Sequence, residues 1–559
     1  MVSIQNLELE LHKSFKEKKY SEIIFEITSK TKEEERNAGL FVLLGISRMS
    51  LDKKNKEQIE LAVSDFKKGY LKEKTSENSL NALVNYVLAS AILSDFENTN
   101  IDFDEIRRFY NESPESFQNK RSINIAMTKI YKRLNDYKYL LPHLEKIIKA
   151  RNFMPNNLCN YGYWRCFDKS WSQDKFFEYG KFVENNLIKY PEDQLVKISL
   201  KKNKKIKLGI LSADLYNGHS ITYFLKTILL NYDKNKIEIY LFANEINDND
   251  ISTEIYQLVY KTINISKLSD LNALNKIREL NLDIMIDLMG YTSRNRIGLF
   301  KNRIAKKQLT WMGYCNTTGL KDMDYIISDH NLINPNEEKF YVEKVKYLPE
   351  IWNCHEGFDF ERKENLPPFL KNNYITFGSF NNPAKINEDV VDCWSKILRN
   401  IKNSKLIIKC GNNIQKLIRI EKLIEERGIS KSVIFHKPID DKKDHLNLYK
   451  KIDIALDTFP YNGVTTSFEA IWMGVPVLTM AGYNFNSRCG ESINKNLNLE
   501  FLIAKDEEEY VSKAINLSNN TKKFLELRKF IYVEALKSPL FDQKKFAKSF
   551  FKVLEEIAN

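Results

Sequence analysis

The chain has 559 residues, which is too many for one domain and enough for three or four. Hydrophobic residues make up 43% and charged residues 29%, a globular composition that argues against a disordered chain. The net charge of +12 comes from 86 basic and 74 acidic side chains spread along the sequence. A nucleic-acid-binding protein would concentrate its basic residues in one patch, so we expect no nucleic-acid partner.

Membrane and export signals are absent from the pattern of apolar residues. No stretch of about 18 apolar residues occurs, so no membrane span is expected. Residues 1–8 already include an acidic residue, Glu8, and contain no apolar segment, unlike a secretory signal. Seven cysteines lack the CxxC spacing of a metal site, and several lie in or beside apolar runs, as Cys410 does. These features predict a cytoplasmic protein with reduced cysteines.

Residues 1–200 are predicted to form successive helices. Apolar residues recur with helical spacing in 40–46, 62–66 and 125–131. A short break at 134–137 precedes a new apolar face, and this pattern resembles a degenerate tetratricopeptide repeat, whose period is about 34 residues. No repeat matches the full consensus, so an ordinary helical bundle is the alternative.

From Lys205 onward, strand-like runs alternate with helical stretches, which predicts βαβ units and parallel sheets. Pro367 and Pro368 divide the runs into two series. We therefore expect one α/β domain at 205–365, a second at 370–538 and a final helix at 539–559. The predicted strands are 206–211, 237–242, 282–288, 308–312 and 325–327, then 374–377, 406–408, 433–435, 452–456 and 476–480.

Two consecutive doubly wound domains imply a ligand cleft between them. This is the twin-Rossmann (GT-B) architecture of glycosyltransferases, but oxidoreductases and periplasmic binding proteins share the general layout. The sequence contains no GxGxxG that opens a βα turn, which argues against a dinucleotide dehydrogenase, and no GxxxxGK[ST], which argues against a P-loop NTPase. A phosphate site must lie elsewhere.

The best candidate phosphate site is the segment 457–476, in which a strand ends at Asp457, a Pro/Asn/Gly turn follows, and a helix begins near Thr466. The free N–H groups and the positive dipole end of that helix would attract a diphosphate. Thr465 and Thr466 add hydroxyl donors, and Glu469 could accept hydrogen bonds from a ribose diol. The alternative is that Thr466-x-x-Glu469 is only a capping box.

This segment resembles the nucleotide-binding motif of the protein O-GlcNAc transferase family, whose bacterial members read much like Asp-Thr-Phe-Pro-Tyr-Asn-Gly-x-Thr-Thr. Asn462 and Gly463 belong to the matching turn. Other blocks resemble family motifs in the same order, and the likeness covers Lys205 to the C-terminus, while the helical N-terminus fits the family's repeat region. These blocks are His219-Ser220-Ile221-Thr222-Tyr223-Phe224, residues 311–319, Phe380-Asn381-Asn382-Pro383-Ala384-Lys385-Ile386 and Ser538-Pro539-Leu540-Phe541.

The resemblance implies roles for residues in these blocks. Lys385 matches a lysine that contacts the donor diphosphate, where an ammonium offsets charge on the leaving nucleotide. Asn382 matches an amide near the base or phosphates. His219 matches a histidine beside the reacting centre, which acts either as a general base or in positioning. The Asp214–His219 spacing is one residue longer than the family pattern. For these residues the alternatives are a solvated lysine and a hydrogen-bonded structural histidine.

Further matches extend the implied site. His445 matches a histidine that packs on the nucleotide base, and Lys442 matches a base-contacting lysine; the alternative for both is a solvated residue at a helix start. Leu448 stands where some members have arginine, and Val464 replaces a histidine of animal members. Arg488 matches an arginine of unclear role. The implied acceptor-side residues are Tyr291, Thr292, Thr317 and Thr318.

Two DxD triplets, 248–250 and 322–324, could suggest a metal, but such triplets are common by chance in a chain with 74 acids. We expect no metal and no cofactor. The resemblance implies inverting transfer from UDP-GlcNAc to protein hydroxyls, with helical repeats that bind protein acceptors and a chain that could form homo-oligomers. UDP-glucose or GDP-fucose are alternative donors. A small-molecule or lipid glycosyltransferase and a non-catalytic repeat scaffold with a decayed transferase domain are the rival functions.

Overall fold

The computed structural model divides the chain into two compact units, Met1–Phe153 and Met154–Asn559, which are described separately. Asn217, Gly218, Asp248, Asn249 and Cys410 lie outside the described residues. The structure describes residues 4–52, 54–72, 74, 76–93, 102–150, 154–199, 201–216, 219–245, 250–362, 364, 366–409, 415–437, 439 and 441–559.

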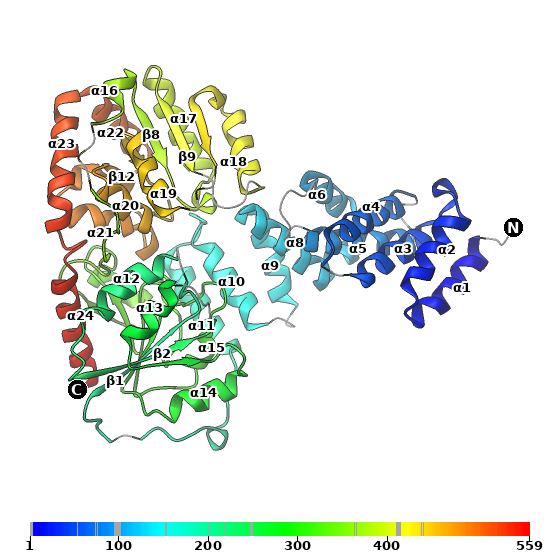
Figure 1. Cartoon of the computed structure of the whole chain (residues 1–559), viewed down its shortest axis with the longest axis horizontal. Coiled ribbons are helices and arrows are strands. Elements are labelled where there is room, and N and C mark those ends of the chain that lie inside the picture. The colour runs from blue at the N-terminus through cyan, green and yellow to red at the C-terminus, as the bar shows by residue number, and fades with distance from the viewer. Residues whose placement is uncertain are drawn as a thin grey trace. The chain divides into compact units, whose positions relative to one another are not determined.

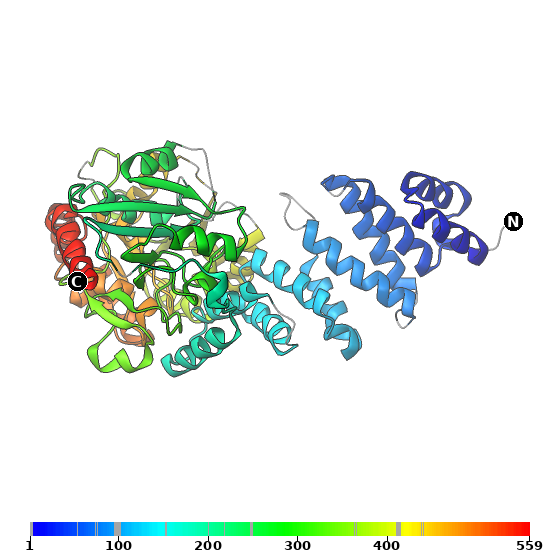
Figure 2. The ribbon, with the colours of Figure 1, turned by 90° about the horizontal axis from the view of Figure 1, so that it is seen from below.

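The first unit is helical, as predicted, and its consecutive helices pack side by side (Figure 2). Asn37 caps α3 by accepting a hydrogen bond from the Leu40 N–H at 2.9 Å. Asn135, in the left-handed conformation with φ of 55°, ends α8 within the predicted break. The helices are α1 (Ile4–Lys16), α2 (Tyr20–Lys30), α3 (Ala38–Leu51), α4 (Lys56–Lys72), α5 (Glu77–Leu93), α6 (Phe103–Glu112), α7 (Glu115–Gln118), α8 (Arg121–Leu134) and α9 (Tyr137–Lys149).

Helices α10 (Pro155–Arg165) and α11 (Gln173–Asn186) belong to the second unit, although the sequence placed them in the repeat region. The backbone of Gly180 in α11 touches Gly319, since a Cβ on Gly319 would lie 2.2 Å from the Gly180 carbonyl carbon. Gln173 Nε2 donates to Asn316 Oδ1 at 2.9 Å. The two helices therefore support the loop at 311–319.

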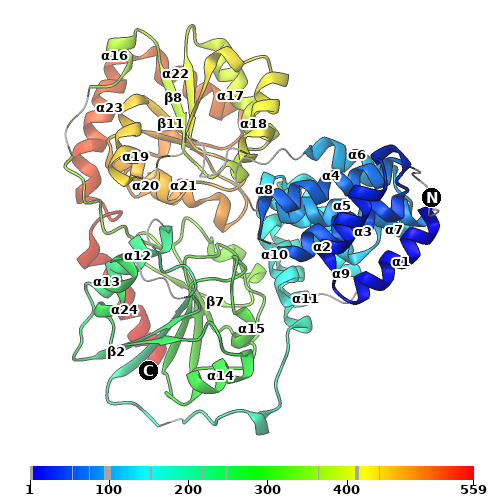
Figure 3. The same cartoon turned by 45° about the vertical axis from the view of Figure 1, so that its right-hand side comes forward.

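The N-lobe, residues 205–365, contains a parallel sheet of order β3-β2-β1-β4-β5-β6-β7 (Figure 3). The five predicted strands are present. β3 and β7 lie at the sheet edges and are mostly exposed or half-buried, so they lack the apolar runs that reveal the buried strands. The strands are β1 (Ile206–Ser212), β2 (Ile237–Ala243), β3 (Lys261–Asn264), β4 (Ile284–Asp287), β5 (Lys307–Thr310), β6 (Tyr325–Ser328) and β7 (Lys344–Tyr347).

The C-lobe, residues 370–538, has a second parallel sheet, of order β10-β9-β8-β11-β12-β13. All five predicted strands occur, and the two-residue β13 at the edge was not predicted. Two parallel doubly wound sheets confirm the predicted α/β twin-Rossmann fold. The strands are β8 (Thr376–Ser379), β9 (Lys405–Lys409), β10 (Val433–His436), β11 (Ile454–Leu456), β12 (Val477–Met480) and β13 (Ile503–Ala504).

The last two long helices run along both lobes (Figure 1). α23 (Thr521–Glu534) packs on the C-lobe helix α20 (Thr465–Trp472), whereas α24 (Gln543–Ala558) packs on α12 (Ser220–Leu229) and β4 of the N-lobe. The ring centroids of Phe550 in α24 and Trp311 after β5 are 4.5 Å apart. The C-terminal segment therefore completes the N-lobe core. Within the described part of the chain, no helix has the length and apolarity needed to cross a membrane.

Candidate functional site

The donor loop, residues 457–464, follows β11 at the carboxyl end of the C-lobe sheet and is organised by Asp457. Asp457 Oδ1 accepts hydrogen bonds from the Gly463 N–H at 2.6 Å, from the Thr458 N–H at 2.8 Å and from Asn381 Nδ2 at 3.2 Å. Its Oδ2 accepts one from Thr479 Oγ1 at 2.8 Å. Burial raises the pKa of Asp457, and these hydrogen bonds oppose the shift. One buried carboxylate thus fixes both ends of the loop.

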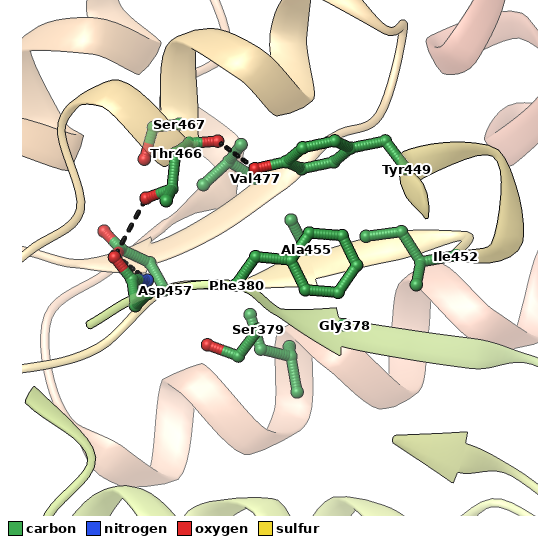
Figure 4. A pocket seen from close by; sticks show the side chains of 12 residues that line it. Gly378, Ser379, Phe380, Tyr449, Ile452, Ala455, Asp457, Thr466, Ser467 and Val477 are labelled. Carbon is green, nitrogen blue, oxygen red and sulfur yellow. Dashed lines mark hydrogen bonds between the residues drawn. The ribbon is translucent and has the colours of Figure 1, made fainter. Parts of the chain in front are cut away.

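Gly463 allows this loop to close tightly against β8. A Cβ at this position would lie 2.6 Å from both Asn381 Oδ1 and Thr466 Oγ1, two atoms that are hydrogen-bonded to each other at 2.9 Å. Figure 4 shows Thr466 and Asp457 near one another at one side of the pocket. Asn462 is fully buried and donates from Nδ2 to the Thr458 carbonyl at 2.9 Å. Asn462 and Gly463 therefore shape the loop from within.

Helix α20 begins directly after the donor loop, and its cap residue is Val464, which makes no side-chain cap. The capping box, which was the alternative to a ligand-binding role for Thr466 and Glu469, is therefore wrong. Glu469 lies in the second turn, and its Oε2 accepts hydrogen bonds from Tyr449 Oη at 2.8 Å and from His445 Nε2 at 2.9 Å. The first N–H groups of the helix, at Thr465 and Thr466, have no intrahelical acceptor and can bind an anion.

Lys385 ends a short 3-10 turn, η4 (Pro383–Lys385), and its side chain reaches the donor loop. Nζ donates to the Asn462 carbonyl at 2.6 Å and lies 4.1 Å from the centre of the Tyr461 ring. Burial lowers the pKa of Lys385, and the charge of Asp457 opposes that shift. Asn382 is exposed and uses Oδ1 to accept from the Ala384 N–H at 3.0 Å, which closes the turn. The structure thus brings Lys385 to the donor loop that precedes α20.

Lys442 and His445 both belong to α19 (Lys442–Leu448), beside α20. The Lys442 ammonium lies 3.9 Å from the centre of the Tyr223 ring, which comes from the N-lobe helix α12. Burial lowers the pKa of Lys442. His445 is mostly buried, with a side chain 12% exposed, and contacts Glu469. Neither residue is the solvated surface residue that was the alternative.

His219 lies in the N-lobe, as the N-cap of α12. Its Nδ1 accepts from the Ile221 N–H at 3.4 Å, and its Nε2 is 3.7 Å from Asp214 Oδ2. Asp214 also pairs with Arg294 at 3.1 Å. Burial lowers the pKa of His219, and Asp214 opposes this shift. In the sequence, Asp214 served only to measure the spacing to His219. Its ion-pair partner Arg294 is 80 residues away, so no local pattern could reveal the pair.

Residues 181–357 and 365–550 match the model of glycosyl transferase family 41. The chain belongs to this family. It is 33% identical over 388 residues to a barley protein named probable UDP-N-acetylglucosamine–peptide N-acetylglucosaminyltransferase SPINDLY, covering 67% of this chain and 41% of that protein. A Caenorhabditis elegans UDP-N-acetylglucosamine–peptide N-acetylglucosaminyltransferase is 22% identical, with 63% and 40% covered. The chain thus spans about two fifths of the length of these relatives.

The fold of this family 41 chain also matches a solved structure of Thermobaculum terrenum O-GlcNAc transferase. The TM-score is 0.75 with 20% sequence identity, and the match covers 94% of this chain and 98% of the other. The match includes the helical region as well as both lobes, because so little of either chain is left out. The predicted family and architecture are confirmed.

The predicted acceptor-side residues of this family 41 chain are mostly buried within the N-lobe. Tyr291, Thr317 and Thr318 are buried, and Tyr291 Oη donates to the Thr318 carbonyl at 2.6 Å. Thr317 Oγ1 donates to Glu343 Oε2, and the Thr318 N–H donates to Glu343 Oε1, both at 2.6 Å. The half-buried Thr292 donates from Oγ1 to the Met289 carbonyl at 2.8 Å. These hydroxyls are therefore engaged in hydrogen bonds within the N-lobe loops.

Among the described residues of this family 41 chain, no three His, Cys, Asp or Glu side chains form a group that could hold a metal ion. Asp322 and Asp324 of the second DxD triplet pair with Arg303 at 3.1 and 2.5 Å. Arg488 forms a two-pronged ion pair with Glu337 at 2.5 and 2.8 Å, which joins the C-lobe to the N-lobe. Arg488 thus connects the lobes, a role that the sequence left open.

Proposed function

We propose that this family 41 chain transfers a sugar from a nucleotide donor, with UDP-GlcNAc favoured, to Ser or Thr hydroxyls of protein acceptors with inversion. The observation that carries the proposal is the convergence of Lys385 and the start of α20 at the donor loop. An ammonium and a helix N-terminus together form a site for a diphosphate. The names of the barley and nematode relatives support the donor and the peptide acceptor.

The proposed chemistry is a single displacement. The acceptor oxygen forms a bond to the anomeric carbon while the bond from that carbon to the diphosphate oxygen breaks, and UDP leaves with the bonding electrons. Lys385 and the N–H groups of Thr465 and Thr466 offset the negative charge that develops on UDP. The acceptor proton is released to solvent water.

The hydrogen-bond geometry of His219 supports a positioning role for this residue in the scheme. Its Nδ1 accepts the Ile221 N–H, so the ring proton lies on Nε2, which faces Asp214. In this tautomer neither ring nitrogen has a free lone pair to accept the proton of the acceptor. His219 is therefore assigned to orienting the acceptor, and Asp214 fixes the ring.

The donor is tested by incubating the pure protein with UDP-GlcNAc, UDP-glucose or GDP-fucose, with and without cell lysate, and measuring free nucleotide and labelled protein. We expect UDP-GlcNAc to be hydrolysed and its sugar to appear on lysate proteins. Preference for another sugar nucleotide would correct the donor. If none of the three donors is turned over, the result would contradict enzymatic activity and favour the scaffold alternative.

Transfer is expected to be independent of a divalent metal, because Lys385 and the helix start supply the positive charge at the diphosphate. The rate of transfer should be the same in excess EDTA as in added Mg²⁺ or Mn²⁺. A loss of activity in EDTA that Mn²⁺ restores would contradict this expectation.

We propose that the helical repeats recruit protein acceptors, which truncation can test. Removing residues 1–153 should leave a folded catalytic unit that hydrolyses donor and glycosylates short peptides but loses most activity on proteins. Removing residues 1–200 should also destabilise the unit, because α10 and α11 support the donor loop and residues 311–319. The ring centroids of Phe167, which follows α10, and Tyr461 are 5.0 Å apart. Equal loss of all activities after the shorter deletion would make the repeats a structural support.

A further inference from the structure

Four polar side chains from four elements form a hydrogen-bonded chain beneath the proposed nucleotide-base site. Lys409 Nζ, at the end of β9, lies 2.9 Å from His445 Nδ1. His445 Nε2 lies 2.9 Å from Glu469 Oε2, and Tyr449 Oη donates to the same oxygen at 2.8 Å. Lys409 lies in none of the motifs that carried the family resemblance, but it is the first member of this hydrogen-bonded series of side chains.

We propose that Lys409 is a positioning residue of the nucleotide site, which fixes the ring tautomer of His445. An ammonium can only donate hydrogen bonds, so His445 Nδ1 must be the acceptor of the Lys409 contact. The ring proton then lies on Nε2 and is donated to Glu469. A second ring proton would require Nδ1 to point a positive N–H at the ammonium 2.9 Å away, which like-charge repulsion opposes.

The charge of Glu469 fits this arrangement. Burial opposes ionisation of Glu469, but His445, the hydrogen bond from Tyr449 and the nearby charge of Lys409 together lower its pKa. The buried group is thus a carboxylate that accepts from both neighbours on Oε2. A ligand hydroxyl would therefore have to approach Oε1. Lys409 places a positive charge on the opposite side of the His445 ring from this carboxylate.

The aromatic surroundings show why the tautomer matters for binding. Phe380 packs edge-on against Tyr449, with ring centroids 4.7 Å apart, and lies 6.4 Å from the His445 ring. The His445 ring is thus fixed by hydrogen bonds at both nitrogens and by rings at its side. A ring held in one orientation offers a flat face for a nucleotide base, and turning the ring would cost both hydrogen bonds. This inference rests on the proposed donor site.

The test compares Lys409→Met, which keeps the length but removes the charge and the donor, with Lys409→Arg, which keeps both. Lys443→Met, an exposed lysine of α19, is the matched control. The ring ¹⁵N signals of His445, assigned with His445→Gln, report the tautomer in the ligand-free protein, and calorimetric titration reports affinity for UDP and GDP. Melting curves verify that each variant is folded, and Lys409→Gln replaces Lys409→Met if the latter fails to fold.

We expect a single Nε2–H form in the wild type and in the arginine variant, and a mixed or doubly protonated ring in Lys409→Met. Affinity for the bound nucleotide should fall about tenfold in Lys409→Met and remain unchanged in the control. An unchanged ring spectrum in Lys409→Met overturns the proposal, as does unchanged affinity with only a lower melting temperature. If the wild type binds neither UDP nor GDP, the proposed function fails, while the ring spectrum still decides the role of Lys409.

Discussion

Replacing Lys385 by alanine is expected to lower kcat by roughly 10²–10³, the effect of removing one preorganised group that stabilises transition-state charge. The free energy of unfolding should fall by only about 1 kcal/mol, the value of the single hydrogen bond to the Asn462 carbonyl. Donor turnover measured beside a melting curve separates these two quantities. Because burial lowers the pKa of Lys385, wild-type kcat should also decline with rising pH at a lower pH than an ordinary lysine would give.

The matched control for this variant is Lys396→Ala, which removes an exposed lysine from α17 (Glu388–Asn400), the helix that follows Lys385. Its kcat and melting temperature should equal those of the wild type. A Lys385→Ala protein with wild-type kcat would refute the proposed stabilisation of the leaving diphosphate. A large fall in stability with unchanged kcat would assign Lys385 to the structure of the loop.

The second large effect is expected at Asp457, where alanine and asparagine should differ sharply. Asp457→Ala leaves the N–H groups of Gly463 and Thr458 and the amide of Asn381 without their acceptor, so we expect a loss of about 3–5 kcal/mol in the free energy of unfolding and no measurable donor binding. Asp457→Asn retains one carbonyl oxygen for these donors, and its amide can donate to Thr479 Oγ1. This variant should lose about 1 kcal/mol.

Denaturant unfolding and titration with UDP measure both effects. Similar large losses in the two variants would mean that the negative charge of Asp457, rather than its hydrogen-bond acceptors, organises the donor loop. A stable Asp457→Ala protein would refute the role of Asp457 altogether.

Local signals in the sequence were sufficient to predict the strand, turn and helix around the donor loop. The strand was predicted to end at Asp457 and the helix to begin near Thr466; in the structure β11 ends at Leu456 and α20 begins at Thr465. Apolar strands and a Pro/Asn/Gly turn are properties of neighbouring residues, so a linear pattern reveals them. The buried strands of both sheets were predicted for the same reason.

Contacts between distant segments could not be predicted in this way. Lys409 and His445 are 36 residues apart, and Asp214 and Arg294 are 80 residues apart. Helices α10 and α11 have the same local pattern as the repeats before them. Contacts with distant residues, such as those of Gly180 with Gly319 and of Gln173 with Asn316, link them to the second unit. Thr317 and Thr318 likewise hold their loop through hydrogen bonds to Glu343, a residue that belongs to none of the motifs.

The packing of α24 on the N-lobe has a consequence for how the protein is made. A ribosome completes residues 205–365 long before residues 543–558, and until then Trp311 has no Phe550 to pack against. The first lobe therefore leaves the ribosome with an open apolar surface where α24 will dock, and it can close only after the second lobe has been synthesised. Nascent chains that stall within the C-lobe should therefore expose this surface to chaperones, although every N-lobe strand is already present.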